Sequence, residues 1–243
     1  MLSSAVFAGF AVGLLVALLQ SAFVEQKILL AERYESHELV HYQGVVSVEA
    51  EAPATDMSKP VVTAAAADHD HAAMEAETSP LVRHGLSVLF AGVIYVGYAL
   101  VMVAGFGIAL RFGKIISLQT GLLWGLAGFM AFQMAPALGL EPELPGTLAA
   151  DLTARQLWWG GCALATVAGF ALLAYGKGVV PRIVALALLA APHVIGAPEL
   201  AAFSGVTPPE LASSFAARSL GVGLIAWVCL GGLLAWFWNR DLA

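Results

Sequence analysis

The chain has 243 residues, of which 60% are apolar and 12% are charged, and its formal net charge is −6. An average soluble domain has roughly 25% charged residues, so this composition excludes an ordinary soluble domain and indicates an integral membrane protein. The two cysteines, Cys162 and Cys229, lie in separate apolar runs. We interpret them as packing residues and expect neither a disulfide framework nor a CxxC site.

Apolar runs predict an all-α polytopic membrane bundle of six helices with a long polar insert after the first. A helix needs roughly 20 apolar residues to cross a bilayer, and five runs reach this length: Ser4–Val24, Leu86–Leu110, Leu118–Leu140, Leu157–Tyr175 and Ser219–Trp238. A sixth run, Val179–Ala197, has Arg182 near its start, so it crosses only if that side chain snorkels to the interface. We favour six spans over five spans plus a re-entrant segment.

These runs divide the chain into three parts. Residues 1–24 form the first transmembrane helix, residues 25–84 form an insert outside the membrane, and residues 85–243 form the remaining bundle. Its expected spans are about 86–110, 118–140, 157–175, 179–197 and 219–238. The first run is too long for a signal-peptide core and has no cation before it, so we interpret it as a retained span.

Basic residues predict the orientation. The short loops after the second and fourth spans carry cations and no acid: Arg111, Lys114, Lys177 and Arg182. Basic loops face the cytoplasm, which places both termini inside and the insert 25–84 outside. All of the 17 Asp and Glu residues except Asp241 then fall on the outer side, where they attract cations.

The first part of the insert, Glu25–His41, is predicted to continue the first span as a helix. His37 and His41 are four residues apart, so on a helix they share one face with Glu38 nearby. Imidazole and carboxylate groups in this arrangement could hold a metal ion. The alternative is a solvated polar face with two incidental histidines.

The rest of the insert, 45–77, is rich in Ala, Glu, Asp, Pro and Thr and is expected to be flexible. His69 and His71 flank Asp70, and an extended chain places residues i and i+2 on the same side. Ordering such a segment costs backbone entropy. We therefore expect weak, rapidly exchanging metal binding, which suits capture and transfer of an ion.

Two further histidines lie at or in the predicted spans. His84 follows Ser79-Pro80, a helix-start signal, and is expected near the outer headgroups, either receiving an ion from the insert or as an interfacial side chain with no such role. His193 follows Pro192 in an apolar run and is a candidate pathway residue, since the proline frees a backbone carbonyl near Leu188. The alternative is a neutral core histidine bonded to a neighbouring helix.

Other patterns have structural readings. The GxxxG pairs Gly9/Gly13 and Gly121/Gly125 predict close helix packing. Gln133 and Met134 form a polar-plus-thioether break before Pro136. No phosphate loop, GxGxxG turn, HExxH pair or nucleophile elbow occurs in the sequence, so we expect no enzymatic activity. The sequence also lacks the paired short segments, broken by Gly or Pro, that mark the two halves of an inverted-repeat transporter. It therefore does not indicate which energy source would drive transport.

Four segments together resemble one known family: "GLLVALLQSAFVEQKILLAERYE", "GLLWGLAGFMAFQMAPALGLEPELPG", "ARQLWW" and "PHVIGAP". In this order, and with a histidine- and acid-bearing insert after the first span, they resemble CbtA, a family of proposed cobalt-transporter subunits. The resemblance implies a bacterial inner-membrane protein for cobalt uptake, tied to cobalamin synthesis, that works with a second, small, single-span and histidine-bearing subunit. It also makes His193, His69 and His71 the preferred ligand candidates.

Chemistry alone does not select cobalt. Imidazole and carboxylate bind Co²⁺, Ni²⁺, Zn²⁺ and Cu²⁺, and Cu²⁺ binds most tightly. Our first hypothesis is a permease component with no fixed cofactor, which transports Co²⁺ or alternatively Ni²⁺ or Zn²⁺. Its expected partners are the metal, the small histidine-bearing subunit and the lipid bilayer, with no nucleic acid. The second hypothesis is a non-transporting membrane scaffold or metallochaperone that presents metal to a separate permease.

Overall fold

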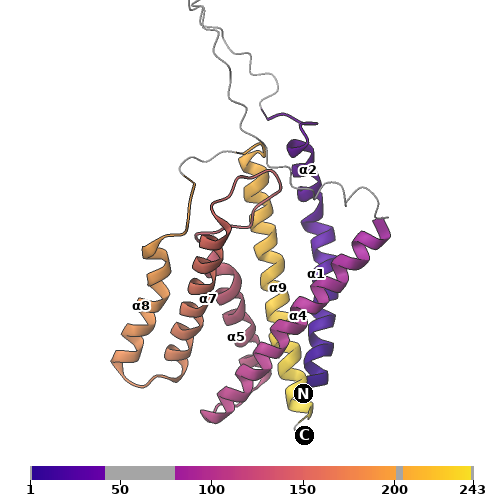
Figure 1. The fold of residues 1–243 in the computed structure, drawn as a ribbon. Coiled ribbons are helices and arrows are strands. Elements are labelled where there is room, and N and C mark those ends of the chain that lie inside the picture. Colours follow the sequence, from indigo (N-terminus) through magenta and orange to yellow (C-terminus); the bar gives the residue numbers. More distant parts are fainter. Residues whose placement is uncertain (1, 42–79, 201–204, 242–243) are drawn as a thin grey trace, which may run out of the picture.

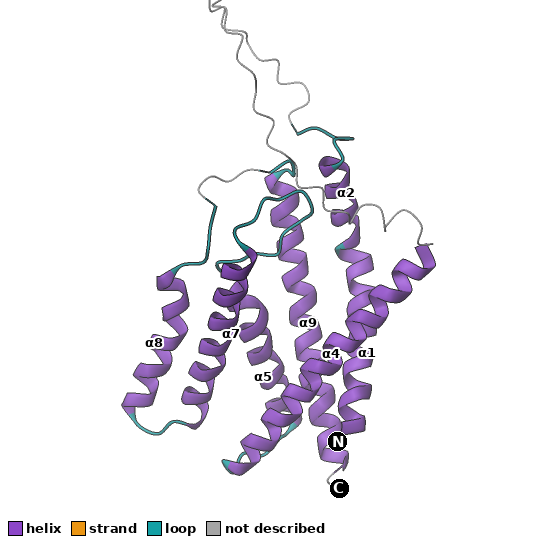
Figure 2. Cartoon of the chain, in the orientation of Figure 1, coloured by secondary structure: helices purple, strands orange, loops and turns teal. Residues whose placement is uncertain are grey.

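The computed structural model describes residues 2–41, 80–200 and 205–241, and these are helical apart from loops and one isolated bridge between Thr147 and Gly205 (Figures 1 and 2). The described elements are α1 (Leu2–Phe23), α2 (Glu25–Glu35), α4 (Pro80–Arg111), α5 (Leu118–Phe129), the one-turn π-helix η1 (Met130–Met134), α6 (Ala135–Ala137), α7 (Leu152–Tyr175), α8 (Val179–Ile195) and α9 (Pro209–Asp241). The prediction of an all-α membrane protein is therefore confirmed.

Four of the described helices, α1, α4, α7 and α9, are long and apolar enough to cross a membrane. Helix α8 is apolar but has only 17 residues. Helices α5, η1 and α6 follow one another directly from Leu118 to Ala137, with 12, 5 and 3 residues. The chain is thus a multi-pass membrane protein, and the count of six spans stays a prediction.

Helix α9 is the organising element of the bundle. It contacts α1, α2, α4 and α5, while α4 lies along α1 and α8 pairs with α7. In Figure 1 the helices alternate in direction, and the two chain ends lie at the same end of the bundle. The α7–α8 pair lies at one side, where α7 contacts η1 and α6. The π-helix is therefore enclosed between α7 and α9.

Small residues allow the main helix pairs to approach closely. A Cβ atom added to Gly9 or Gly13 would lie 2.5 Å from a backbone Cα atom of α4. One added to Gly121 or Gly125 would meet backbone atoms of α9. Within lipid there is no hydrophobic force between helices, so such close backbone contact supplies the dispersion energy that holds them together. The predicted packing role of both GxxxG pairs is confirmed.

Charged residues are divided between the two ends of the bundle. The end where α4 and α7 stop and α8 starts carries Arg111, Lys114, Lys177 and Arg182, and we call it the basic end. The opposite end is formed by α2, the loop Leu138–Asp151 and the start of α9 (Figure 1). It carries most of the described carboxylates, and we call it the acidic end.

Candidate functional site

A π-helix interrupts the third apolar run near the acidic end. The Ala135 N–H donates to the Met130 carbonyl, five residues back, which widens the turn relative to an α-helix. Pro136 follows and has no N–H, so a carbonyl one turn earlier loses its helical donor. The sequence predicts a break at Gln133 and Met134, and the structure makes that break a π-turn. Such turns are frequent at functional sites.

Gln133 projects from this π-turn against α9. Its Oε1 atom is buried and accepts no hydrogen bond within the described part of the chain. It lies against Gly223, because a Cβ atom added there would overlap it. A buried amide oxygen left without a donor costs about 1–3 kcal/mol. The Gln133 amide oxygen is therefore packed against α9 and has almost no accessible surface.

Gln133 also lines a cavity of about 200 Å³. The walls come from η1, α6, the loop after them, α7 and α9: Phe132, Gln133, Pro136, Ala137, Leu140, Pro142, Trp159, Ser219 and Leu220. Three of these side chains carry a polar group: the Gln133 amide, the Ser219 hydroxyl and the Trp159 indole N–H. The space is a partly open pocket with a mixed apolar and polar lining and no charged side chain.

An aromatic stack packs behind the π-turn. The rings of Phe132 and Trp227 are parallel, with centroids 5.5 Å apart, and Tyr98 lies 4.6 Å from Trp227. Trp227 is 2% exposed, and its Nε1 atom also has no partner among the described residues. Two buried polar atoms on adjoining helices, one acceptor and one donor, are thus unsatisfied in the same region.

Acidic side chains lie close to this cavity at the acidic end. The loop that supplies Leu140 and Pro142 also carries Glu141 and Glu143. Glu143 accepts a hydrogen bond from the Arg155 guanidinium at 2.6 Å, which fastens the loop to the first turns of α7. Glu141 is exposed and adds negative charge at this end.

His193 lies near the end of its predicted span, as the sequence places it, and it is not among the buried residues of the bundle. It lies two residues before the end of α8 and is exposed on the surface of the bundle. Gly196, with φ of 86°, ends the helix there. The His193 ring stands edge-on to Trp158 at 6.3 Å, and the Trp158 Nε1 donates to the Pro192 carbonyl at 3.3 Å. His193 is therefore positioned at the acidic end.

The predicted helical pairing of His37 and His41 is wrong. The helical continuation extends only to Glu35, and Ser36 caps α2. His37 has φ of 60°, a left-handed conformation that commonly ends helices but is usually occupied by glycine. The polypeptide turns there, so His37 and His41 do not share a helical face. His41 lies beyond the turn, after a bend at Glu38 and Leu39.

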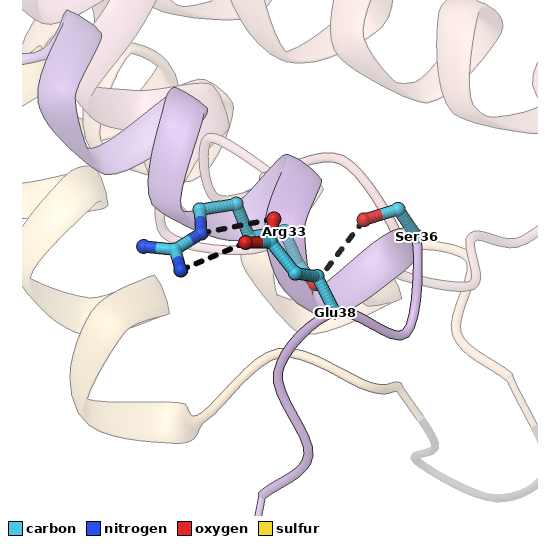
Figure 3. Close-up of polar contacts among 3 residues, drawn as sticks. All are labelled: Arg33, Ser36 and Glu38. Atoms are coloured by element: carbon cyan, nitrogen blue, oxygen red, sulfur yellow. Dashed lines mark hydrogen bonds and ion pairs between the residues drawn. The ribbon is translucent and has the colours of Figure 1, made fainter.

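Glu38 is already engaged by a cation of the protein. The Arg33 guanidinium donates to both carboxylate oxygens, at 3.1 and 3.0 Å, and the Ser36 hydroxyl donates to the Arg33 carbonyl (Figure 3). Hydrogen bonding by Arg33 lowers the pKa of Glu38. A metal ion at Glu38 must compete with this guanidinium. The spacing of residues in the sequence did not predict the ion pair between Arg33 and Glu38.

The remaining candidates are not brought together by the described structure. His84 lies in the second turn of α4, and His69, Asp70 and His71 lie outside the described residues. Within 2–41, 80–200 and 205–241, no group of three or more His, Cys, Asp or Glu side chains could hold a metal ion. The described bundle thus offers the π-turn cavity rather than a metal-binding cluster of these residues.

Comparison with known families decides the identity of the chain. The family model of the probable cobalt transporter subunit, CbtA, matches residues 1–239. The chain belongs to the CbtA family. The resemblance found in the sequence is confirmed, and the family description makes CbtA one component of a transporter, which implies partner subunits. No curated protein and no solved structure matches the chain.

Proposed function

We propose that this CbtA chain is the membrane-embedded component of a cobalt importer in the bacterial inner membrane, and that the imported ion supplies cobalamin synthesis. The observation that carries the proposal is the family match over nearly the whole chain, joined to a bundle with one acidic and one basic end. Its partner would be the small single-span, histidine-bearing subunit.

The division of charge supports an inward direction. Short basic loops are retained on the cytoplasmic side, so the basic end would face the cytoplasm, together with both chain ends. The acidic end and the insert 25–84 would then face outward. A surface lined with carboxylates raises the local concentration of divalent cations, which is an advantage at the entry side of an importer.

Capture would occur outside the membrane. His69 and His71 with Asp70, joined by His37 and His41, are the residues proposed to collect the ion, and His84 at the start of α4 would receive it from the insert. His193, exposed at the tip of α8, would act here as an outer-end ligand instead of an intramembrane stop. Glu38 would contribute only when Arg33 releases it.

Transport in liposomes tests the proposal. Purified CbtA, alone and with its partner subunits, is reconstituted around a metal-sensitive dye and exposed to Co²⁺, Ni²⁺ and Zn²⁺ in turn. We expect Co²⁺ to enter when the transporter is complete. Failure of every metal to enter the vesicles, with the protein correctly folded and inserted, would contradict the import function.

His193→Ala tests the outer-end ligand separately. Val194 is its neighbour and is 83% exposed, so Val194→Ala is a matched control on the same turn. We expect His193→Ala to raise the Co²⁺ concentration needed for half-maximal uptake and Val194→Ala to leave it unchanged. Equal uptake by both variants would remove His193 from the route.

The scaffold or metallochaperone hypothesis has one observation in its favour. The described bundle contains no group of three metal-binding side chains, so metal held only by the insert could be passed to a separate permease. In the same liposome assay, a scaffold would bind Co²⁺ at equilibrium but never admit it, with or without partner subunits. An importer would do both.

A further inference from the structure

We propose that the basic end of the bundle binds the phosphate group of an anionic phospholipid between two loops. The first loop joins α4 to α5, and the second joins α7 to α8. These loops and the helix turns beside them carry four exposed cations, which we call the two-loop cluster: Arg111, Lys114, Lys177 and Arg182. The inference depends neither on cobalt import nor on which side of the membrane the cluster faces.

Aromatic contacts hold the two loops together although they are far apart in the sequence. The rings of Phe112 and Tyr175 are stacked, with centroids 4.8 Å apart and planes at 27° to each other. The Lys114 Nζ atom lies 6.0 Å from the centroid of the Tyr175 ring. In Figure 1 the end of α4 and the turn between α7 and α8 lie at the same end of the bundle. Two separate segments therefore bring their cations to one region of the surface.

The charge of the cluster is not neutralised by the described part of the protein. Three other described arginines have partners, because Arg33 and Arg155 pair with carboxylates and Arg218 donates to a backbone carbonyl. Within the described residues, no member of the two-loop cluster forms an ion pair with a carboxylate, and neither loop contains an acidic residue. The cluster is therefore open to an anion from outside the chain.

The cluster lies at the depth of the lipid headgroups. Helices α4 and α7 are both long and apolar enough to cross the membrane, and they end at Arg111 and Tyr175, so the residues that follow lie at the interface. A guanidinium group donates two parallel hydrogen bonds to phosphate oxygens, and an ammonium group adds a point charge. Basic residues between membrane helices bind anionic headgroups in this way.

Exposed apolar side chains beside the cluster favour a lipid over a dissolved phosphate ion. Phe112 and Ile115 in the first loop are 60% and 82% exposed, and Val180 beside the second loop is 71% exposed. A phosphate ion gains nothing from such groups, whereas the acyl chains of a lipid cover them and remove them from water. The surface thus offers cations to the headgroup and apolar contacts to the chains of one molecule.

Native mass spectrometry of the purified full chain in detergent measures lipid binding at this site. The probes are phosphatidylglycerol, which is anionic, and phosphatidylcholine, which is zwitterionic, with inorganic phosphate as a competitor. Arg111→Gln and Lys177→Gln each remove one charge from the cluster. Arg240→Gln is the matched control, because α9 ends at the same end of the bundle and Arg240 already lies over the Trp236 ring, 4.6 Å from its centroid. Size-exclusion chromatography confirms folding of each variant.

We expect the original chain to bind phosphatidylglycerol more tightly than phosphatidylcholine. Each cluster variant should bind phosphatidylglycerol about fivefold more weakly, the factor that corresponds to about 1 kcal/mol for each cation near the headgroups. Arg240→Gln should leave binding unchanged. Equal losses in all three variants would show a general attraction to a basic surface and would overturn the site. Equal binding of the two lipids, or displacement of phosphatidylglycerol by inorganic phosphate, would overturn the lipid as its ligand.

A second pair of variants tests the geometry without changing any charge. Tyr175→Leu removes the ring that joins the two loops, whereas Tyr175→Phe keeps that ring and loses only the hydroxyl. We expect Tyr175→Leu to weaken phosphatidylglycerol binding about as much as the loss of one cation, about fivefold, and Tyr175→Phe to bind like the original chain. Unchanged binding by folded Tyr175→Leu would contradict a site formed by both loops.

Discussion

Replacing Gly125 by alanine should loosen the contact between α5 and α9. The added Cβ would meet the Trp227 carbonyl oxygen and would lie 2.9 Å from Val228 Cα, whereas carbon atoms pack best at about 3.5–4.0 Å. Helix α9 would have to retreat by about 0.5–1 Å, which forfeits a quarter to a half of the dispersion energy of each contact affected. We expect the overpacking to cost about 1–3 kcal/mol.

Gly97→Ala is the matched control for this change. Gly97 also lies within a long helix, α4, and has nothing within 4 Å of an added Cβ. Both substitutions gain about 1 kcal/mol of helix propensity, so the difference between their free energies of unfolding isolates packing. Unfolding in mixed SDS–detergent micelles, followed by tryptophan fluorescence, measures it. Equal stability of the two variants would refute the claim that direct backbone contact holds α5 to α9.

Three more outcomes follow from the outer end of the chain. Arg33→Gln should return the pKa of Glu38 toward 4.5 in an NMR titration and strengthen Co²⁺ binding, since the carboxylate is released. In the original chain the ion pair stabilises the fold at pH values above 4.5. This stabilisation is lost as the pH falls through the lowered pKa of Glu38 in the folded protein. Single cysteines at Ser36 and Lys114, in a chain without native cysteines, should differ in labelling by an impermeant maleimide added outside, with only Ser36→Cys reacting. His37→Gly should keep the hydrogen-exchange protection of the α2 amides, because glycine adopts a φ of 60° without the strain of about 1 kcal/mol that histidine has there. The same change should weaken Co²⁺ binding if the His37 imidazole collects the ion. Unchanged binding would exclude His37 as a ligand.

The helices were predictable because lipid imposes a simple rule on the sequence. Every backbone polar group must be satisfied inside the membrane, so long apolar runs become helices whatever they pack against. The runs beginning at Ser4 and Leu118 correspond to helices that start at Leu2 and Leu118. Helix ends outside the membrane follow local chemistry instead. The left-handed turn after α2 has His37 at a position that glycine usually occupies. No pattern in the sequence predicted this turn.

The candidate site was only partly predictable. Gln133 is the one polar side chain deep in its apolar run, and Pro136 follows it, so the sequence indicated a break. It could not show a π-turn, because the choice between α and π bonding depends on how η1 packs against α7 and α9. The orphan state of Oε1 depends on contact with Gly223, which lies 90 positions further along the chain. The place of His193 was predictable, since the expected span 179–197 has it near the end and α8 ends at Ile195.

Selectivity for cobalt cannot arise from imidazole and carboxylate ligands alone. The intrinsic affinity of these ligands favours Cu²⁺ over Co²⁺. A tight histidine site on the proposed route would therefore fill with copper and block passage. Weak capture by a series of exposed ligands at the acidic end avoids this blockage and leaves the choice of metal to ligand geometry and to the supply of ions. Co²⁺ uptake measured with increasing Cu²⁺ should accordingly show competition without lasting inhibition, and irreversible inhibition by Cu²⁺ would contradict a series of weak sites.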